Sequence, residues 1–427
     1  MQPMKPKILI LGSDIGTIDI AIEAKKMGLY VITSDLMESS PTKECSDEAW
    51  LISTNDLPLL TEKCIANGIS GVLAGVSEFN AGCAHQLAKN LGLPVLCKNE
   101  EAWAVGRNKY LFKQKSRDYG VPVADDYILT DELLRDDLDK INYPVVVKPV
   151  DKSGNRGMSY CYDEEELIAA YRKARECSDY PYIICERMLC GQEYNANYVL
   201  CNGEARLLYF SALYNEPGEP ANLYSMMVTT CRHLNKWNEE VHPYLLRFIK
   251  ESGFENGIVW FENFMDSDGH FYLIDPAYRL SSESSYALFE KVSGFNAIKW
   301  LIEDAIGIKH NVDDMPQIPS CSNTSCVAGY HLFASQDGII SSIVGLDIIS
   351  SIDAIVLDMP KRENTQITKH RLMGVIKIYA DSIDLLIEKI KIINEYFSIN
   401  DKFGNNLFIR FDDYYSLRRD FIPRNSN

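Results

Sequence analysis

The segment 257–279 constrains the fold of this chain more than any other stretch. Aromatic and β-branched residues flank Asp268 and Gly269, and Asp-Gly between two such runs is a strong signal for antiparallel strands joined by a tight turn. Pairing of these strands brings the acids Glu262 and Asp275 together. The sequence therefore predicts a β-hairpin that presents two carboxylates.

Two carboxylates on one hairpin have two interpretations. With Arg279 shortly after Asp275, they suit a Mg²⁺ ion that holds nucleotide phosphates while the guanidinium group receives an anionic substrate. They equally suit an acidic strand edge with an unrelated arginine nearby. A single motif does not decide between the two, so the rest of the chain must.

Length and charge exclude several classes of protein. A chain of 427 residues with 46% hydrophobic residues predicts two to four domains with real cores. A net charge of −17 without a basic tract argues against nucleic-acid binding. No apolar run approaches the roughly 20 residues that cross a bilayer. The twelve cysteines form no CxxC pair and no signal peptide is recognised, so reduced thiols and a cytoplasmic location are expected.

The first part of the chain alternates between strand and helix patterns. Strands are predicted at 7–12, 30–35, 71–75 and 93–96, with helices at 15–27 and from about residue 78. This alternation predicts an open parallel sheet in a small α/β domain at 1–103. The first turn, Gly12 to Gly16, with Asp35 after the second strand, invites comparison with a dinucleotide fingerprint. Its spaced glycine triplet is absent, so a structural turn is preferred.

The middle of the chain supplies basic and acidic residues at the ends of elements. Lys109 stands in the first turn of a helix predicted at 108–119, where it opposes the helix dipole and is either solvated or held for an anion. Lys148 closes an apolar strand, and the loop at 153–158 has two glycines that can aim N–H groups at phosphates, or make a plain hairpin. Glu186 and Glu193 are either ordinary exposed acids or part of a nucleotide slot.

Taken in order, these segments resemble the ATP-grasp superfamily over about residues 5 to 310. The phrases at 46–50, 90–94 and 119–122 are similar to members related to carbamoyl-phosphate synthetase, biotin carboxylase, L-amino-acid ligases and phosphoribosylglycinamide synthetase. The resemblance implies a mixed α/β and α+β architecture. An ATP-grasp domain would occupy 104–310, with a lid subdomain at about 121–187.

The resemblance also implies the nucleotide contacts. Lysine ammonium groups and the glycine-containing loop would hold the phosphates, the strand at 182–189 and its backbone would read the adenine amino group and purine edge, and an acid beyond it would hold the ribose hydroxyls. In chain order these residues are Lys109, Lys148, Ser153, Gly154, Gly157, Met158, Glu186, Arg187, Met188, Leu189 and Glu193.

The implied metal site departs from the family pattern. Glu262 and Asp275 would ligate Mg²⁺, for which Mn²⁺ is an acceptable substitute, and Lys148 and Arg279 would act in catalysis, with Arg279 facing the reacting carboxylate or acyl phosphate. The usual family block is Glu-x-Asn-x-Arg, whereas here Asp275 is shorter and Ala277 lacks the amide oxygen that often completes a second metal site. Whether one or two metals bind is left open, and Asn263 is a candidate replacement ligand.

Residues 311–427 comprise a linker, at 311–325, and a domain that resembles the carboxy-terminal α+β lid domain of such ligases, and a homodimer is compatible with that resemblance. Strands are predicted at 326–333, 338–345, 372–379 and 406–411, with a helix at 382–396. Substrate-selecting residues are expected within 211–236, including Tyr214, Tyr224 and Arg232.

The leading hypothesis is an ATP- and Mg²⁺-dependent ligase that activates a small-molecule carboxylate as an acyl phosphate for attack by an amine. Two alternatives stay open. One is an enzyme of the same superfamily that activates bicarbonate or formate. The other is an ATP-binding regulator without turnover, suggested by Ala277. The sequence names neither the acid nor the amine.

Overall fold

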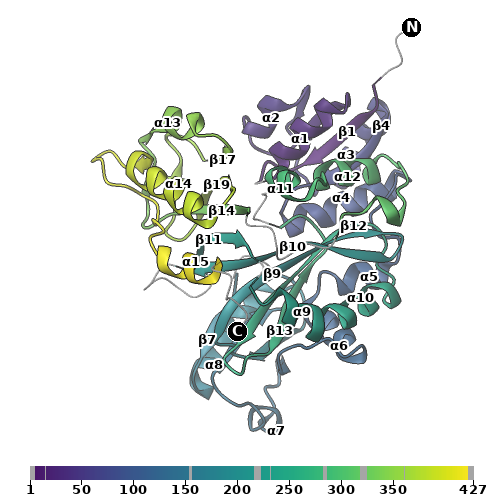
Figure 1. The fold of residues 1–427 in the computed structure, drawn as a ribbon. Helices are drawn as coiled ribbons and strands as arrows, with labels where there is room; N and C mark the ends of the chain where they lie inside the picture. Colours follow the sequence, from purple (N-terminus) through teal and green to yellow (C-terminus); the bar gives the residue numbers. More distant parts are fainter. Residues whose placement is uncertain are drawn as a thin grey trace.

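The computed structural model is built around three main β-sheets (Figure 1). A four-stranded parallel sheet forms the amino-terminal part, an eight-stranded antiparallel sheet forms the centre, and a four-stranded antiparallel sheet forms a separate lid. The structure describes residues 5–14, 16–152, 156–215, 223–230, 232–281, 286–317, 325–359 and 361–421.

The amino-terminal sheet confirms the predicted open parallel topology. Its strands run in the order β3-β2-β1-β4, and the apolar run of β1 is buried because helices cover both faces. The elements are β1 (Lys7–Leu11), α1 (Thr17–Lys26), β2 (Tyr30–Ser34), α2 (Pro41–Cys45), β3 (Glu48–Trp50), α3 (Leu57–Asn67), β4 (Ile69–Ala74) and α4 (Glu78–Asn90).

One strand predicted in this part is wrong. Residues 93–96 form no strand, because Pro94 has no N–H to donate to a ladder. The Leu96 carbonyl instead accepts from the N–H of Asn256, at 2.9 Å, in the central part of the chain. The turn after β1 is structural, as preferred: Ser13 donates to Asp35, and Lys43 pairs with the same carboxylate at 2.8 Å.

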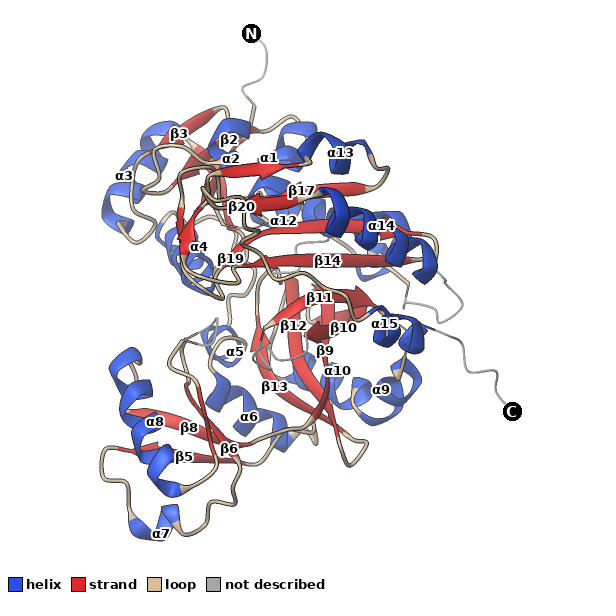
Figure 2. Ribbon diagram, turned by 90° about the vertical axis from the view of Figure 1, so that its left-hand side faces the viewer, coloured by secondary structure: helices blue, strands red, loops and turns tan. Residues whose placement is uncertain are grey.

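The lid lies to one side of the molecule, at the lower left of Figure 2. Its strand order is β5-β8-β6-β7. Helix α8 covers this sheet with an apolar stripe that includes Leu167, Tyr171 and Ala174. The lid elements are β5 (Asp126–Thr130), α7 (Arg135–Leu138), β6 (Val145–Pro149), β7 (Ser159–Cys161), α8 (Glu164–Cys177) and β8 (Tyr182–Arg187).

The central sheet runs in the order β13-β12-β9-β10-β11-β14-β19-β17. It continues past the boundary expected near residue 310, because β11 pairs with β14 through Met226 and Tyr330. The predicted domain boundaries remain predictions. The strands are β9 (Gly191–Cys201), β10 (Glu204–Asn215), β11 (Tyr224–Thr229), β12 (Gly257–Asp266), β13 (Phe271–Ala277), β14 (Cys326–Phe333), β17 (Ile355–Asp358) and β19 (Leu372–Ala380).

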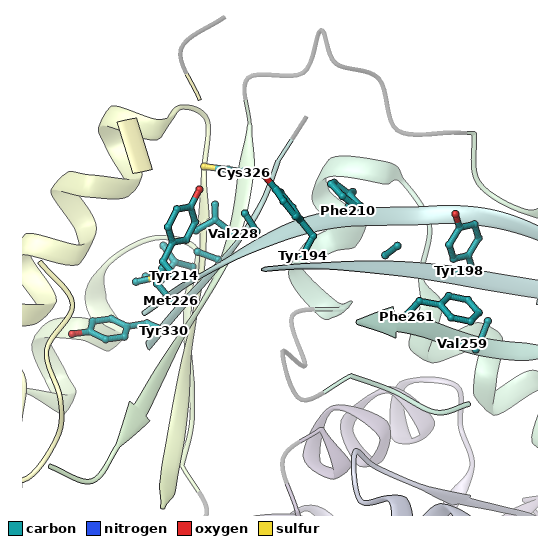
Figure 3. Packing of buried hydrophobic residues seen from close by; sticks show 14 of the residues in the cluster. Tyr194, Tyr198, Phe210, Tyr214, Met226, Val228, Val259, Phe261, Cys326 and Tyr330 are labelled. Carbon is teal, nitrogen blue, oxygen red and sulfur yellow. The ribbon is translucent and has the colours of Figure 1, made fainter. Parts of the chain in front are cut away.

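Aromatic packing on this sheet forms the largest core (Figure 3). Tyr194 on β9 stacks on Phe210 of β10 with ring centroids 5.0 Å apart. Tyr330 from β14 belongs to the same cluster, so one core spans the central and carboxy-terminal strands. The helices that flank the central strands are α5 (Glu100–Val105), α6 (Lys109–Asp118), α9 (Leu234–Glu240), α10 (His242–Glu251), α11 (Tyr286–Ser293) and α12 (Ala297–Ala305).

Two predicted carboxy-terminal strands are corrected. The segment 338–345 is split into β15 (Gly338–Ile339) and β16 (Ser342–Val344), because β15 pairs with β18 while β16 pairs with β20. The segment 406–411 makes only isolated bridges, since its backbone bonds go to different partners. The remaining elements are η1 (Val312–Asp314), α13 (Leu346–Ser351), β18 (Gln366–Ile367), α14 (Ile383–Tyr396), β20 (Ser398–Asn400) and α15 (Tyr414–Phe421).

Two sequence-based expectations concern the whole chain. Within the described residues, none of the helices has the length and apolar character needed to cross a bilayer. The cysteines that the structure describes are free thiols, and most of them are buried or half-buried.

We predict a pH-dependent stability from Asp304 on α12. Its side chain is only 9% exposed, and burial, with the neighbouring Glu303 carboxylate, raises its pKa to about 8 from an ordinary value of 3.8. Between these values the native carboxyl keeps its proton while the unfolded one loses it, so stability falls as pH rises through this window. The stability of Asp304→Asn relative to the unsubstituted chain should therefore increase by about 1–3 kcal/mol between pH 5 and pH 8.

Chemical denaturation at the two pH values measures this difference. Asp313→Asn, at an exposed position nearby, is the control and should show no such increase. An equal effect of Asp304→Asn at both pH values would contradict a protonated native carboxyl.

Candidate active site

A cavity of about 760 Å³ lies between the lid and the central sheet. Its lining comes from regions far apart in sequence, including the lid strands, the segment that joins β8 to β9, the β12–β13 hairpin and the start of α4. Predicted site residues that line it are Lys109, Lys148, Met158, Glu186, Arg187, Met188, Leu189, Glu193, Glu262, Asp275 and Arg279.

The β12–β13 hairpin places its two acids as predicted. Glu262 and Asp275 are register partners, and Trp260, Glu262 and Phe264 alternate along β12 to face the cavity. Asn263 therefore points to the other face, where it is buried and its Nδ2 donates to the Phe261 carbonyl at 3.1 Å. It does not replace the amide that Ala277 lacks.

Two lysines hold the Asp275 carboxylate. The Lys109 ammonium group lies 2.9 Å from one oxygen, and Lys148 donates to the other at 2.9 Å. Lys109 is delivered by α6, which begins here because the Asn108 side chain caps the N–H groups of the first turn. Burial alone would raise the pKa of Asp275, but the two ammonium groups hold it well below its usual range.

The Glu186 carboxylate bridges Lys148 and a third lysine. One oxygen lies 3.0 Å from Lys148 and the other 2.9 Å from Lys113, a fully buried residue one turn after Lys109 on α6. The predicted contact with an adenine amino group stays a prediction, since this carboxylate already serves two cations. Lys113 was missed by the sequence analysis. Its spacing of one helical turn from Lys109 was the available signal.

Glu193 on β9 lies beside Glu262. Burial and the negative charge of Glu262 raise the pKa of Glu193 well above its usual value, and the two carboxyl groups hydrogen-bond to each other. Its predicted role at the ribose hydroxyls stays a prediction. In this structure it adds a third acid to the Glu262–Asp275 pair.

The hinge between β8 and β9 is fixed by its own hydrogen bonds. The N–H groups of Arg187 and Met188 donate to the carbonyls of Asp125 and Pro144, at 2.9 and 3.1 Å. The Cys190 N–H donates to Asp266 at 2.7 Å. Residues 186–191 are all described, and within them these bonds leave the Leu189 N–H without a partner, while Leu189 lines the cavity. This geometry suits the predicted recognition of a purine edge.

Arg279 forms a second charged cluster with the amino-terminal part of the chain. Its Nε lies 2.8 Å from the Glu78 carboxylate at the start of α4, and Arg107 pairs with the same carboxylate. Both guanidinium groups hold the pKa of Glu78 below its usual value against the effect of burial. Glu78 and Arg107 were not identified from the sequence, because nothing local links three residues so far apart.

The glycine-containing loop is described in part. Gly157 has φ +78°, and a Cβ there would meet the Pro149 ring at 2.9 Å, so this position requires glycine. Met158 lines the cavity. Ser153 and Gly154 lie outside the described residues.

Residues expected to select substrates are divided between two places. Tyr214 and Tyr224 line the cavity. Arg232 instead pairs with Asp420 of α15, and that carboxylate also accepts from the Tyr214 hydroxyl at 3.0 Å. Arg232 therefore helps to attach the carboxy-terminal helix next to the cavity.

Comparison with known proteins identifies the fold around this site. Residues 141–284, which include the lid loop, the hinge and the acid pair, match the family described as ATP-grasp domain. The chain carries an ATP-grasp domain. The resemblance and the ATP-grasp fold predicted from the sequence are thereby confirmed, whereas the roles of single residues remain predictions.

The relatives of this ATP-grasp chain include ligases and carboxylases. Dapdiamide A synthase of Enterobacter agglomerans is 26% identical over 245 residues, which cover 55% of this chain and 56% of that protein. The chain spans about half the length of the curated relatives it matches.

Solved structures agree on the fold over almost the whole chain. The L-amino acid ligase of Bacillus licheniformis has a TM-score of 0.75 at 18% identity, covering 93% of this chain and 99% of that one. The biotin carboxylase domain of the Hydrogenobacter thermophilus 2-oxoglutarate carboxylase, solved with MgADP and bicarbonate, has a TM-score of 0.76 at 17% identity, covering 93% of this chain and 91% of that one.

We predict unequal stability effects for the two hairpin acids. Asp275→Asn removes the shared partner of Lys109 and Lys148 and should lower the free energy of unfolding by about 2–4 kcal/mol. Glu262→Gln should change it by less than about 1 kcal/mol, because burial and Asp275 disfavour the Glu262 carboxylate and raise its pKa.

Urea unfolding at neutral pH compares the two variants, each of which replaces a carboxyl group with an amide at one of two paired hairpin positions. Equal destabilisation would contradict the distinction between an acid held by two lysines and one whose carboxylate is disfavoured.

Proposed function

We propose that this chain is an ATP- and Mg²⁺-dependent ligase that activates a carboxylate as an acyl phosphate for attack by an amine. The observation that carries the proposal is the convergence of Lys109, Lys148 and the Glu262–Asp275 pair in one cavity. Phosphoryl transfer needs cations around the transferred group and little covalent chemistry from the protein.

The donor set fits a magnesium ion. Glu262 and Asp275 offer carboxylate oxygens from adjacent strands, and Mg²⁺ is commonly held by one or two carboxylates with the remaining ligands from substrate phosphates and water. Among the described residues, no group of three or more metal-ligating side chains is arranged to hold a metal alone. A bound Mg²⁺ would neutralise charge on the phosphates and also at Asp275.

The lysines then have a second use. In this structure the Asp275 carboxylate forms ion pairs with both Lys109 and Lys148. Once Asp275 serves as a metal ligand, both ammonium groups are available to the phosphate oxygens of ATP. The hinge at Leu189 would hold the purine, and the lid loop that contains Gly157 and Met158 would exclude water from the acyl phosphate.

Arg279 suits the substrate end of the site. Its guanidinium group lies on the Glu78 side of the cavity and over the Trp260 ring, with 5.3 Å to the ring centroid. A substrate carboxylate held there would attack the γ-phosphorus, and the bond to ADP would break. The amine nitrogen would then attack the acyl carbon, lose a proton, and release inorganic phosphate.

The curated and structural relatives support a ligase and keep a second substrate class in view. Dapdiamide A synthase and an L-amino acid ligase are among them, whereas the carboxylase structure contains bicarbonate. Small-molecule carboxylate and amine substrates, a homodimer and a cytoplasmic location belong to this proposal and not to the findings.

We predict that the protein releases ADP from MgATP only when a carboxylate substrate is present. Hydroxylamine should capture the acyl phosphate as a hydroxamate, because it is a strong nucleophile that needs no binding site. A coupled ADP assay over a panel of amino acids, other carboxylic acids, formate and bicarbonate measures the dependence. Tight ATP binding without turnover on the whole panel would favour an ATP-binding regulator, and turnover with bicarbonate or formate alone would favour the second substrate class.

We further predict that Glu262→Gln and Asp275→Asn each lower kcat at least about a hundredfold, as expected for loss of a main electrostatic contributor. Because Glu262→Gln should fold normally, its loss of activity would not be explained by instability. Removal of Mg²⁺ with a chelator should abolish turnover, and Mn²⁺ should restore it. Full activity in either variant would refute the metal assignment.

A further inference from the structure

The buried lysine Lys113 has no role in the site as described so far. It lies behind Glu186, with its ammonium group 2.9 Å from that carboxylate and 3.4 Å from the Ala124 carbonyl. Its side chain is 0% exposed, so it cannot reach a nucleotide in the cavity. Burial lowers the pKa of Lys113, and the Glu186 carboxylate opposes this shift.

Lys113 is the end of a chain of alternating charges. The order is Lys113, Glu186, Lys148, Asp275 and Lys109, with neighbouring groups 2.9 or 3.0 Å apart. Its members come from α6, β8, β6 and β13. This series of ion pairs therefore connects the helix that carries Lys109 with two strands of the lid.

Charge balance gives Lys113 a purpose that stability alone does not. A carboxylate beside a single lysine cancels the charge of that lysine, whereas a carboxylate shared by two lysines leaves one net positive charge. If Asp275 were a metal ligand and no longer paired with Lys148, Glu186 would be the remaining partner of Lys148. With Lys113 present, Lys148 keeps an attractive charge for phosphate oxygens.

Geometry points the same way. Lys148 pairs with Ile184 and Glu186 with Val146 in the β6–β8 ladder, so the two charged side chains are diagonal neighbours on one face of the lid sheet. Glu186 can therefore hold the Lys148 side chain in a fixed direction after Asp275 is released. A buried ion pair adds little net stability compared with apolar residues of similar size, which makes a purely structural purpose the weaker explanation.

We propose that Lys113 is a positioning residue for phosphate binding: by neutralising Glu186 it lets that carboxylate orient Lys148 without cancelling its charge. This inference rests on the proposed ATP site. Lys113 lies outside the cavity, and it should affect binding of the nucleotide phosphates but not binding of the base.

The test compares ATP with adenosine, which has the same base and ribose but no phosphates. In Lys113→Met, calorimetric binding of ATP with Mg²⁺ should weaken at least about tenfold, while adenosine binding should change less than about twofold. Lys113→Arg should keep ATP binding, because it restores the charge. Lys115→Met is the matched control on the same helix, since Lys115 is partly exposed and pairs with Glu101, and it should bind both ligands normally.

The double variant Lys113→Met, Glu186→Gln separates charge from folding. Its reference is the single variant Glu186→Gln: with the carboxylate gone there is no charge left for Lys113 to neutralise, so adding Lys113→Met to Glu186→Gln should weaken ATP binding less than about twofold. It also provides the test if Lys113→Met alone does not fold.

Three results would overturn the inference. These are unchanged ATP binding in Lys113→Met, parallel loss of adenosine and ATP, and a weakening of ATP binding by Lys113→Met that is as large in Glu186→Gln as in the unsubstituted chain. If the unsubstituted chain bound no ATP, the proposed function would fall and this inference with it. Normal ATP binding by both the unsubstituted chain and Lys113→Met would overturn this inference alone.

Discussion

The candidate site depends on one buried carboxylate, Asp275, shared between Lys109 and Lys148. A buried charge is tolerated only when it is paired, so this contact ties together the first turn of α6, the end of β6 in the lid and strand β13. These three elements belong to different parts of the fold and have no common hydrogen-bond ladder. The geometry of the cavity follows from this constraint, because separating the elements would leave the Asp275 carboxylate without its two ammonium partners.

Under the proposed function, the same contact would let the site exchange partners. Glu262, Glu193 and Asp275 place three acids in a small volume, where burial and their mutual repulsion raise the pKa values of Glu193 and Glu262. A divalent cation would relieve this repulsion by taking Asp275 from the lysines. The free site and the nucleotide-bound site would then have similar charge balance, with protein ammonium groups in one and metal in the other.

Sequence patterns revealed the parts of this arrangement that depend on local order. The Asp268-Gly269 turn indicated the hairpin that carries Glu262 and Asp275, and the apolar strand before Lys148 located that residue at the lid edge. The irregularity between Glu262 and Asn263, which brings Glu262 opposite Asp275, was not visible in the sequence. Contacts between distant segments were not visible either: no spacing rule connects Lys113 with Glu186, or Arg107 and Arg279 with Glu78. Pro94 argued against a strand at 93–96, so that error was avoidable. The pairing of β11 with β14 could not be predicted from the sequence, because strand partners depend on tertiary structure.

The Glu78 cluster connects the amino-terminal sheet with the candidate site. Glu78 begins α4 at the carboxyl edge of that sheet, and it orients Arg279 and Arg107 at once. One carboxylate between two guanidinium groups leaves a net positive charge at the Arg279 end of the cavity, just as one carboxylate between two lysines does at Lys148. Under the proposed function, these two clusters would draw the acid substrate and the nucleotide to opposite ends of one cavity. The first cluster joins the amino-terminal part to the hairpin, and the second joins the lid to the hairpin. Because the hairpin contributes to both, it would set the distance over which the phosphoryl group passes.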